Sequence, residues 1–181
     1  MILAVDVFYI DSKKYRVSGV IFEEWSSYEA NVIVNITYFS EKEIPPYVSG
    51  QFKDRELPCL LKIIKEFDLN KVETIVIDGY AVLGNDSGFI QTLGVSLHQE
   101  LCKLGYSTIS IIGVAKTKYK DDSMLKYSRE IYRGEATRPL YISSINMNPD
   151  EAANHIKSMF GGNKIPYLLD LADKVSKGKN K

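Results

Sequence analysis

Two aspartates stand in segments that are otherwise apolar, and their chemistry most needs an explanation. Asp6 interrupts an apolar run over residues 2–9, and Asp78 ends a second run over residues 74–77. An ionised carboxylate among buried residues is costly unless it is paired, hydrogen-bonded or bound to a metal ion. Taken singly, Asp6 could accept hydrogen bonds from a turn or an arginine, and Asp78 could cap the turn that follows it.

The two aspartates suggest a metal site if their strands are neighbours. Two carboxylates brought together would repel, and a hard divalent cation with oxygen ligands is the usual solution. Mg²⁺ fits best, because no His or Cys lies nearby in sequence to suggest zinc. A metal held by carboxylates can activate water and stabilise charge on an attacked phosphate. The expected reaction is therefore phosphodiester hydrolysis.

A short segment after the apolar residues 108–114 could contact phosphate. Residues 116–120 read KTKYK, so that lysines alternate with polar and aromatic residues, as in segments that follow a nucleic-acid backbone. Asp121 and Asp122 offset this positive charge immediately. Phosphate contact and an ordinary solvated surface both remain open for this segment.

The elements that must position these residues follow from the hydrophobic pattern. Segments 2–9, 15–23 and 30–39 are rich in Val, Ile, Tyr and Phe and are separated by short polar breaks, which predicts an antiparallel three-stranded meander. Apolar residues then recur at helical spacing up to about residue 67. The elements predicted after this helix are a strand over 72–77, a Gly-containing turn, a helix over 90–104, a strand over 108–114, a loop or hairpin over 116–145, and helices over 149–160 and 166–175.

This order of elements predicts an α/β protein with the ribonuclease H-like fold. An antiparallel meander leads into parallel crossovers, which are right-handed in nearly all proteins, and C-terminal helices follow. In that arrangement the first strand lies beside the fourth. Asp6 should therefore meet Asp78 at the carboxyl end of the fourth strand, where open α/β sheets place their ligand sites.

Composition limits the class of protein. The chain has 181 residues, 45% of them hydrophobic and 25% charged, which is typical of one soluble domain over residues 1–181 and excludes disordered, collagen-like and disulfide-stapled classes. We expect residues 176–181 to form a flexible basic tail. Lys and Arg number 23, as do Asp and Glu, so no net charge steers the chain toward polyanions or membranes. Cys59 and Cys102 stand among apolar residues and are expected to be reduced core residues.

A cytoplasmic location is expected, with no membrane partner. No apolar run approaches the roughly 20 residues of a membrane span. The apolar start of the chain is interrupted by Asp6 before the core of a signal peptide could form. The sequence also shows no evident need for an obligate protein partner.

Several fragments of the chain resemble the endonuclease V family, the deoxyinosine 3′ endonucleases. Each fragment is weak alone, but they occur in the family's order and span nearly the whole chain. The fragments are AVDVFY (4–9), PPYVSGQFKDRE (45–56), VIDG (76–79), GVAK (113–116) and LADKVS (171–176). The resemblance implies an Mg²⁺-dependent endonuclease, with Mn²⁺ as a substitute, that cuts DNA or RNA on the 3′ side of inosine.

The resemblance also implies roles for individual residues in catalysis. Asp6 and Asp78 match the two metal-binding aspartates, and Glu56 matches a third active-site carboxylate at the start of a helix. Lys116 matches the lysine that approaches the scissile phosphate. Such a lysine adds a positive contact that strengthens as negative charge develops.

Further residues match contacts to the substrate. Tyr47, followed by Val48, matches the wedge that stands between bases, and an aromatic wedge recovers part of the unstacking energy. Gly50 and Gly79 match glycines whose backbone lies against the extruded hypoxanthine. Tyr80 and Tyr119 are candidate nucleic-acid contacts beside these positions.

The chain departs from the family where histidines are usual. Tyr80 stands in the family's Asp-Gly-His-Gly motif at the histidine, and the further histidine a few residues on is absent. A later Gly-His pair corresponds to Ile145 and Asn146. Asn146 could donate a hydrogen bond or hold a water near the metal, but it cannot shuttle protons.

Two alternatives to an inosine-specific nuclease stay open. One is a binding protein that recognises a deaminated or unpaired base and cuts poorly or not at all. The other is a different metal-dependent phosphodiesterase on the same scaffold, with Tyr47 in an ordinary loop. A purely structural role would leave Asp6, Glu56 and Asp78 unexplained together.

Overall fold

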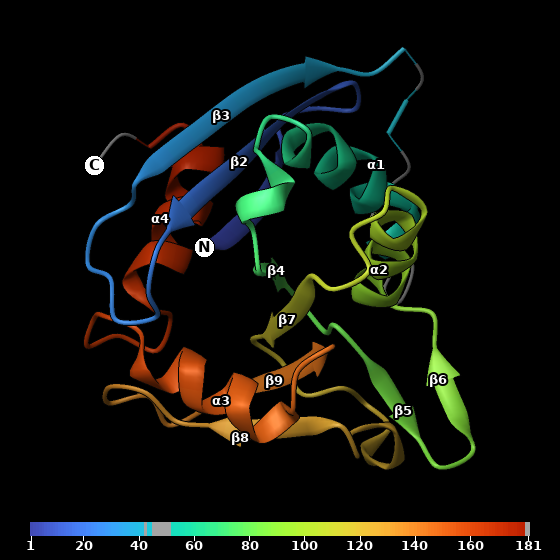
Figure 1. Ribbon diagram of the computed structural model, residues 1–181, viewed down its shortest axis with the longest axis vertical. Helices are drawn as coiled ribbons and strands as arrows, with labels where there is room; N and C mark the ends of the chain where they lie inside the picture. Colours follow the sequence, from blue (N-terminus) through green and yellow to red (C-terminus); the bar gives the residue numbers. More distant parts are fainter. Residues whose placement is uncertain (42, 45–51, 180–181) are drawn as a thin grey trace.

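A computed structural model describes residues 1–41, 43, 44 and 52–179 of the chain. Its centre is a seven-stranded mixed sheet in the order β3-β2-β1-β4-β7-β9-β8 (Figure 1). The strands of this sheet are β1 (Ile2–Tyr9), β2 (Lys14–Phe22), β3 (Val32–Phe39), β4 (Thr74–Asp78), β7 (Ser110–Ala115), β8 (Ser128–Ile131) and β9 (Leu140–Ile145).

Helices cover both faces of the sheet. The four α-helices are α1 (Phe52–Ile64), α2 (Leu93–Lys103), α3 (Pro149–Ser158) and α4 (Tyr167–Ser176). Helices α1 and α2 pack on one face, while α3 and α4 pack on the other (Figure 1). Local signals fix some helix ends: Thr92 caps α2 by accepting a hydrogen bond from the Val95 N–H, and Asn148 caps α3 in the same way.

The pairing of the strands confirms the predicted ribonuclease H-like order. β1 pairs antiparallel with β2, and β2 pairs antiparallel with β3. β1 also pairs parallel with β4, which in turn pairs parallel with β7. The first strand therefore lies beside the fourth, as the element order predicts.

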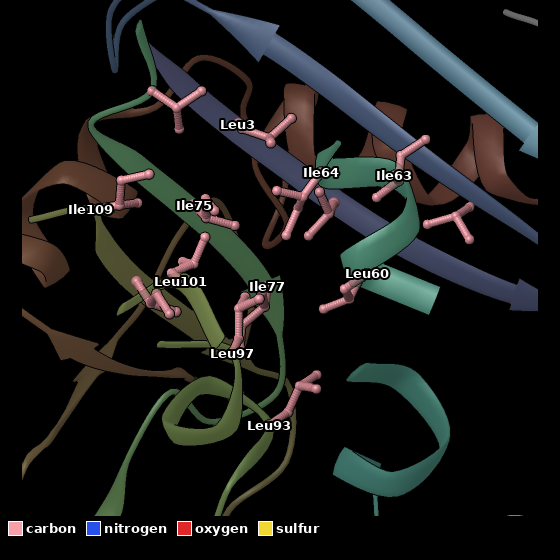
Figure 2. Packing of buried hydrophobic residues seen from close by; sticks show 14 of the residues in the cluster. Leu3, Leu60, Ile63, Ile64, Ile75, Ile77, Leu93, Leu97, Leu101 and Ile109 are labelled. Atoms are coloured by element: carbon pink, nitrogen blue, oxygen red, sulfur yellow. The ribbon is translucent and has the colours of Figure 1, made fainter. Parts of the chain in front are cut away.

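The central strands are apolar on both sides because both of their faces are covered. In β1, Leu3 and Val5 belong to the core under α1 and α2, and Ile2 and Ala4 belong to the core under α3 and α4. Figure 2 shows the first of these cores, where Leu3 lies among residues of α1, α2 and β4. Alternation between polar and apolar residues is therefore absent from β1, which makes Asp6 conspicuous.

The stretch 116–145, expected to be a loop or a hairpin, holds a short 3₁₀ turn (Asp122–Met124) and a β8–β9 hairpin that widens the sheet beyond β7. Two other elements differ from the expectation. The turn expected after Asp78 contains a small hairpin of β5 (Leu83–Asn85) and β6 (Gly88–Ile90). Helix α1 ends at Ile64, and a 3₁₀ turn at Leu69–Lys71 leads into β4.

Two expectations about single residues need correction. Cys59 is buried as expected, but Cys102 is exposed, because it lies on the outer side of α2. The flexible tail expected from about residue 176 does not include Ser176 or Lys177, since Ser176 is buried at the end of α4 and Lys177 is paired with Asp173. Among the described helices, none combines the length and the apolar character that a membrane crossing requires.

Candidate active site

Asp6 and Asp78 lie side by side at one end of the sheet. In the parallel pair β1 and β4, Ala4 stands opposite Val76, and each aspartate follows two residues later. Side chains in a strand repeat their direction every two residues, so both carboxylates share the face of Ala4 and Val76. Both aspartates also line one cavity of about 190 Å³. The structure thus brings the two predicted aspartates together.

Lys116 joins them from the neighbouring strand. It directly follows β7, and its Nζ donates a hydrogen bond to Asp78 Oδ2 at 2.8 Å. Burial alone would lower the pKa of Lys116, but the Asp78 carboxylate raises that pKa above its ordinary value. The ammonium group therefore stays charged. The side chains of Lys116 and Asp78 are 46% and 47% exposed, so the pair is open to a ligand.

Glu56 approaches from α1, on the other side of the sheet. It lines a larger cavity, of about 630 Å³, together with Asp6, Asp78 and Lys116. Burial raises the pKa of Glu56 to about 8, and the negative charges of Asp78 and Asp6 add to this effect. Burial likewise raises the pKa of Asp6 to about 6. Asp6 and Glu56 are thus disfavoured in their charged forms by burial and by neighbouring carboxylates, and a cation beside them and Asp78 would be stabilised.

Two residues of α4 complete the site, and the sequence reasoning missed both. The Ser176 hydroxyl donates to Asp6 Oδ2 at 2.5 Å, which lowers the pKa of Asp6 against the effect of burial. Asp173 lines the smaller cavity, and Lys177 Nζ donates to both of its carboxylate oxygens at 2.7 Å. The fragment 171–176 carried the signal, but its helical pattern alone gave these polar residues no role.

Asp6, Glu56 and Asp78 are the residues that could hold a metal ion. Their carboxylate oxygens suit a hard divalent cation such as Mg²⁺. Burial, and after it the charge of neighbouring carboxylates, raises the pKa values of Asp6 and Glu56, and a bound cation would favour their ionised forms. In the part of the chain that the structure describes, no three His, Cys, Asp or Glu side chains are already arranged around one ion position. The cation beside Asp78 is here the Lys116 ammonium.

The larger cavity extends from these residues over the chain segments that follow β4 and β7. Gly79 has a φ of 90°, a conformation that favours glycine, and it turns the chain along the cavity. The Tyr80 hydroxyl donates to the Thr117 carbonyl and accepts from the Tyr119 N–H, each at 3.0 Å. Tyr80 and Tyr119 both line the cavity, but the hydroxyl of Tyr80 is committed to holding the segment after Lys116.

Asn146 is not brought to this site. Its side-chain amide donates to the carbonyls of Ser107 and Ile109, at 2.7 and 3.2 Å, beside the start of β7. Lys116 follows the other end of that strand. The expected place of Asn146 next to the metal is therefore corrected: antiparallel pairing of β9 with β7 carries the end of β9 away from the carboxylates.

Three candidate residues lie outside the described part of the chain. These are Tyr47, Val48 and Gly50, the expected wedge and one of the expected base contacts. They remain predictions. The described site consists of Asp6, Glu56, Asp78 and Lys116, to which α4 adds Asp173 and Ser176.

Comparison with known proteins shows the family and the fold of the chain. The family model described as endonuclease V matches residues 1–174 of the chain. No curated protein sequence matches it significantly. Among solved structures, that of Ciona intestinalis endonuclease V, in complex with a 24mer DNA containing an inosine followed by a ribo-adenosine, is similar with a TM-score of 0.69 and 19% identity. The match covers 98% of this chain and 84% of that one.

Two further structures share the fold. The catalytic domain of human endonuclease V has a TM-score of 0.68 and 20% identity, with 98% of this chain and 80% of the human chain covered. A protein of unknown function from Archaeoglobus fulgidus has a TM-score of 0.59 and 12% identity, with 98% and 96% covered. At these identities the structures support the fold, and the family model supports the family.

Proposed function

This chain belongs to the endonuclease V family, and from that premise we propose that it is a nuclease that hydrolyses inosine-containing nucleic acid on the 3′ side of the inosine. The observation that carries the proposal is the convergence of Asp6, Asp78 and Lys116 where β1, β4 and β7 meet. Related endonuclease V has been crystallised with inosine-containing DNA. We further propose that the reaction depends on Mg²⁺, for which Mn²⁺ can substitute.

The carboxylates would hold the metal ion. Asp6, Glu56 and Asp78 would supply the oxygen ligands, and the bound ion would supply an activated water and charge stabilisation at the attacked phosphate. Asp78 would exchange its hydrogen bond with Lys116 for contact with the ion. Ser176 would keep Asp6 oriented and ionised, because its hydroxyl donates to Asp6 Oδ2.

Lys116 would then bind the scissile phosphate. Its ammonium lies at the rim of the site, is half exposed, and is charged at neutral pH. A phosphate gains negative charge as the attacking oxygen approaches, so this contact is stronger in the transition state than in the bound substrate.

The larger cavity is the place proposed for the extruded base. Its volume of about 630 Å³ lies within the range of small-molecule sites, roughly 300–1,000 Å³. The backbone of Gly79 borders this cavity without a side chain to obstruct a planar ring. Lys116 lines the same cavity, so the proposed base and the proposed scissile phosphate would lie close together beside Asp78.

A second function, binding without cleavage, is favoured by two features of the site. Asp78 accepts a hydrogen bond from the Lys116 ammonium, and among the described residues no three ligands are already arranged around one ion position. The chain also has Tyr80 where the family usually has a histidine. A protein of this kind would recognise inosine and release it uncut.

The two functions are separated by cleavage of end-labelled oligonucleotides with one central inosine, in DNA and RNA forms. We expect a nick 3′ to inosine with Mg²⁺ or Mn²⁺ and none with EDTA, and Asp78→Asn should lower the rate by about a hundredfold or more. Asp86→Asn is the matched control, because Asp86 is a highly exposed aspartate paired with Lys126.

Other outcomes are equally informative. Tight binding without a nick would establish the binding protein. Cutting without preference for inosine would indicate a general metal-dependent phosphodiesterase of the same fold. The proposal would be overturned if the protein neither bound nor cut either nucleic acid.

A further inference from the structure

Three exposed aromatic rings form a row on the surface of the molecule. Tyr28 lies in the connection between β2 and β3, Phe160 in the connection between α3 and α4, and Tyr167 at the start of α4. The Phe160 ring centroid is 6.1 Å from that of Tyr28 and 6.0 Å from that of Tyr167. The three residues are 62%, 52% and 39% exposed. Contiguous exposed rings of this kind mark an interaction surface.

The segment that carries Phe160, between α3 and α4, is held in place by a buried arginine. Arg133 is buried, and its guanidinium donates hydrogen bonds to the carbonyls of Met159, Gly161 and Asn163. A buried cation that binds only carbonyls is costly and holds the backbone in one conformation. The Tyr167 N–H also donates to the Phe160 carbonyl at 2.9 Å. The rings are therefore presented in fixed positions, which lowers the entropy lost on binding.

The same segment leads directly into the active site. Ile165 and Leu169, on either side of Tyr167 in sequence, line the cavity that contains Asp6 and Asp78. Lys164 reaches the site from the same segment, because its Nζ lies 3.5 Å from the carbonyl oxygen of Lys116. The segment 160–169 thus connects the row to the catalytic cavity, and Lys164 lies in that segment.

We propose that Tyr28, Phe160 and Tyr167 form a stacking platform for unpaired nucleotides of the substrate strand beyond the catalytic cavity. The platform rests on the proposed nuclease function. Every base has a flat face that stacks on an aromatic ring, so this contact tolerates any sequence next to the inosine. Lys164 supplies positive charge for the phosphates between the cavity and the platform.

The test measures how affinity grows with strand length. Single-stranded DNA with one inosine, extended stepwise on its 5′ or its 3′ side, is titrated in EDTA so that binding is read without cleavage. We expect affinity to rise when the strand on one side becomes long enough to reach Phe160. Phe160→Leu should bind the long strands about tenfold more weakly than the wild type, because the ring is lost while an apolar side chain remains.

Two variants separate stacking from a structural effect. Phe160→Tyr should retain the length-dependent increase, because it keeps an aromatic ring at the same position. Phe39→Leu, at the far end of β3 from Tyr28 and 71% exposed, should bind like the wild type. Equal binding of long strands by wild type and Phe160→Leu would overturn the platform, as would a loss that is the same for short and long strands.

Fluorescence gives a second readout. Trp25 is the chain's only tryptophan, lies three residues before Tyr28 in the same connection, and stacks on His155 with ring centroids 4.6 Å apart. Its emission should change when long strands bind the wild type, and not when short ones do. The length series is repeated with strands that lack inosine, so that a failure of inosine cleavage leaves the platform measurable on its own.

Discussion

Asp6 and Asp78 occupy equivalent positions on neighbouring parallel strands, yet their surroundings differ. Asp6 is held by the buried Ser176 hydroxyl of α4, and burial raises its pKa to about 6. Asp78 is half exposed and is held by the charged Lys116. The fold thus gives one carboxylate a largely buried, hydrogen-bonded environment and leaves the other accessible. If the proposed nuclease function holds, Asp6 would lie in the interior of the site and Asp78 on the side open to substrate.

The largest expected effect is on the pH dependence of stability. A carboxylate whose pKa is raised by folding binds its proton more tightly in the folded state, so the free energy of unfolding falls as pH rises through the interval between the unfolded and folded values. For Asp6 this interval is about pH 4 to 6, and Glu56 extends it to about 8. Without divalent cations, the decrease in the free energy of unfolding that Asp6 causes over this interval should reach about 3 kcal/mol.

Urea denaturation at pH 4, 6 and 8 measures this loss. Asp6→Asn should remove the part of this fall between pH 4 and 6 that Asp6 contributes, while the part that Glu56 contributes up to pH 8 remains. Asp78→Asn should leave most of the fall in place. Addition of Mg²⁺ at pH 8 should restore stability to the wild type, because an ion bound only to the folded state stabilises it. If the free energy of unfolding fell as steeply between pH 4 and 6 in Asp6→Asn as in the wild type, burial would not distinguish the two aspartates.

A smaller effect is expected when the partner of Asp6 is changed. Ser176→Ala removes the hydrogen bond that lowers the pKa of Asp6, so that this pKa should rise above about 6. The acidic limb of the pH profile for kcat/KM should move upward by up to about one pH unit, the size expected for one hydrogen bond to a charged group.

Ser158→Ala is the control for this change. Its hydroxyl donates to a carbonyl within α3, and the residue is exposed on the surface. It should leave the acidic limb where the wild type has it. An acidic limb that stays in place in Ser176→Ala, or moves downward, would mean that Asp6 does not limit activity at low pH.

Asp6 and Asp78 on the strands were predictable from the hydrophobic pattern, and Glu56 from the family resemblance, but the residues of α4 were not. Asp6 and Asp78 interrupt or end apolar runs, and the element order alone predicts that their strands are adjacent. Asp173 and Ser176 lie in an amphipathic helix, where polar residues are ordinary. Only the packing of α4 against β1 turns them toward Asp6.

Asn146 shows the complementary limit. Its correspondence to a family histidine gave it a place near the metal, but sequence alone does not fix which end of β9 approaches the active site. The antiparallel pairing of β9 with β7 places Asn146 beside Ser107 and Ile109 instead. A residue's role can therefore be transferred from its family only when the direction of its strand is known as well as its identity.

The smallest expected effect concerns the Asp78 side of the comparison. Tyr80 joins the turn after Asp78 to the segment after Lys116 through its hydroxyl, which contacts the Thr117 carbonyl and the Tyr119 N–H. Tyr80→Phe keeps the ring and removes these hydrogen bonds, whose net value is about 1 kcal/mol. We expect kcat to fall about fivefold with Mg²⁺ affinity unchanged, because Lys116 is displaced while the carboxylates are not.

Tyr132→Phe, an exposed tyrosine after β8, is the matched control and should not change kcat. If Tyr80→Phe instead raised KM alone, the hydroxyl would act in substrate binding, and Lys116 would be held by Asp78 without help from Tyr80. If Mg²⁺ affinity fell as well, the two sides of the site would not be independent. Since the Tyr80 hydroxyl joins the segments beside Asp78 and Lys116, a selective loss of kcat would place the accessible carboxylate and its lysine in the chemical step, with Asp6 and α4 as the fixed frame.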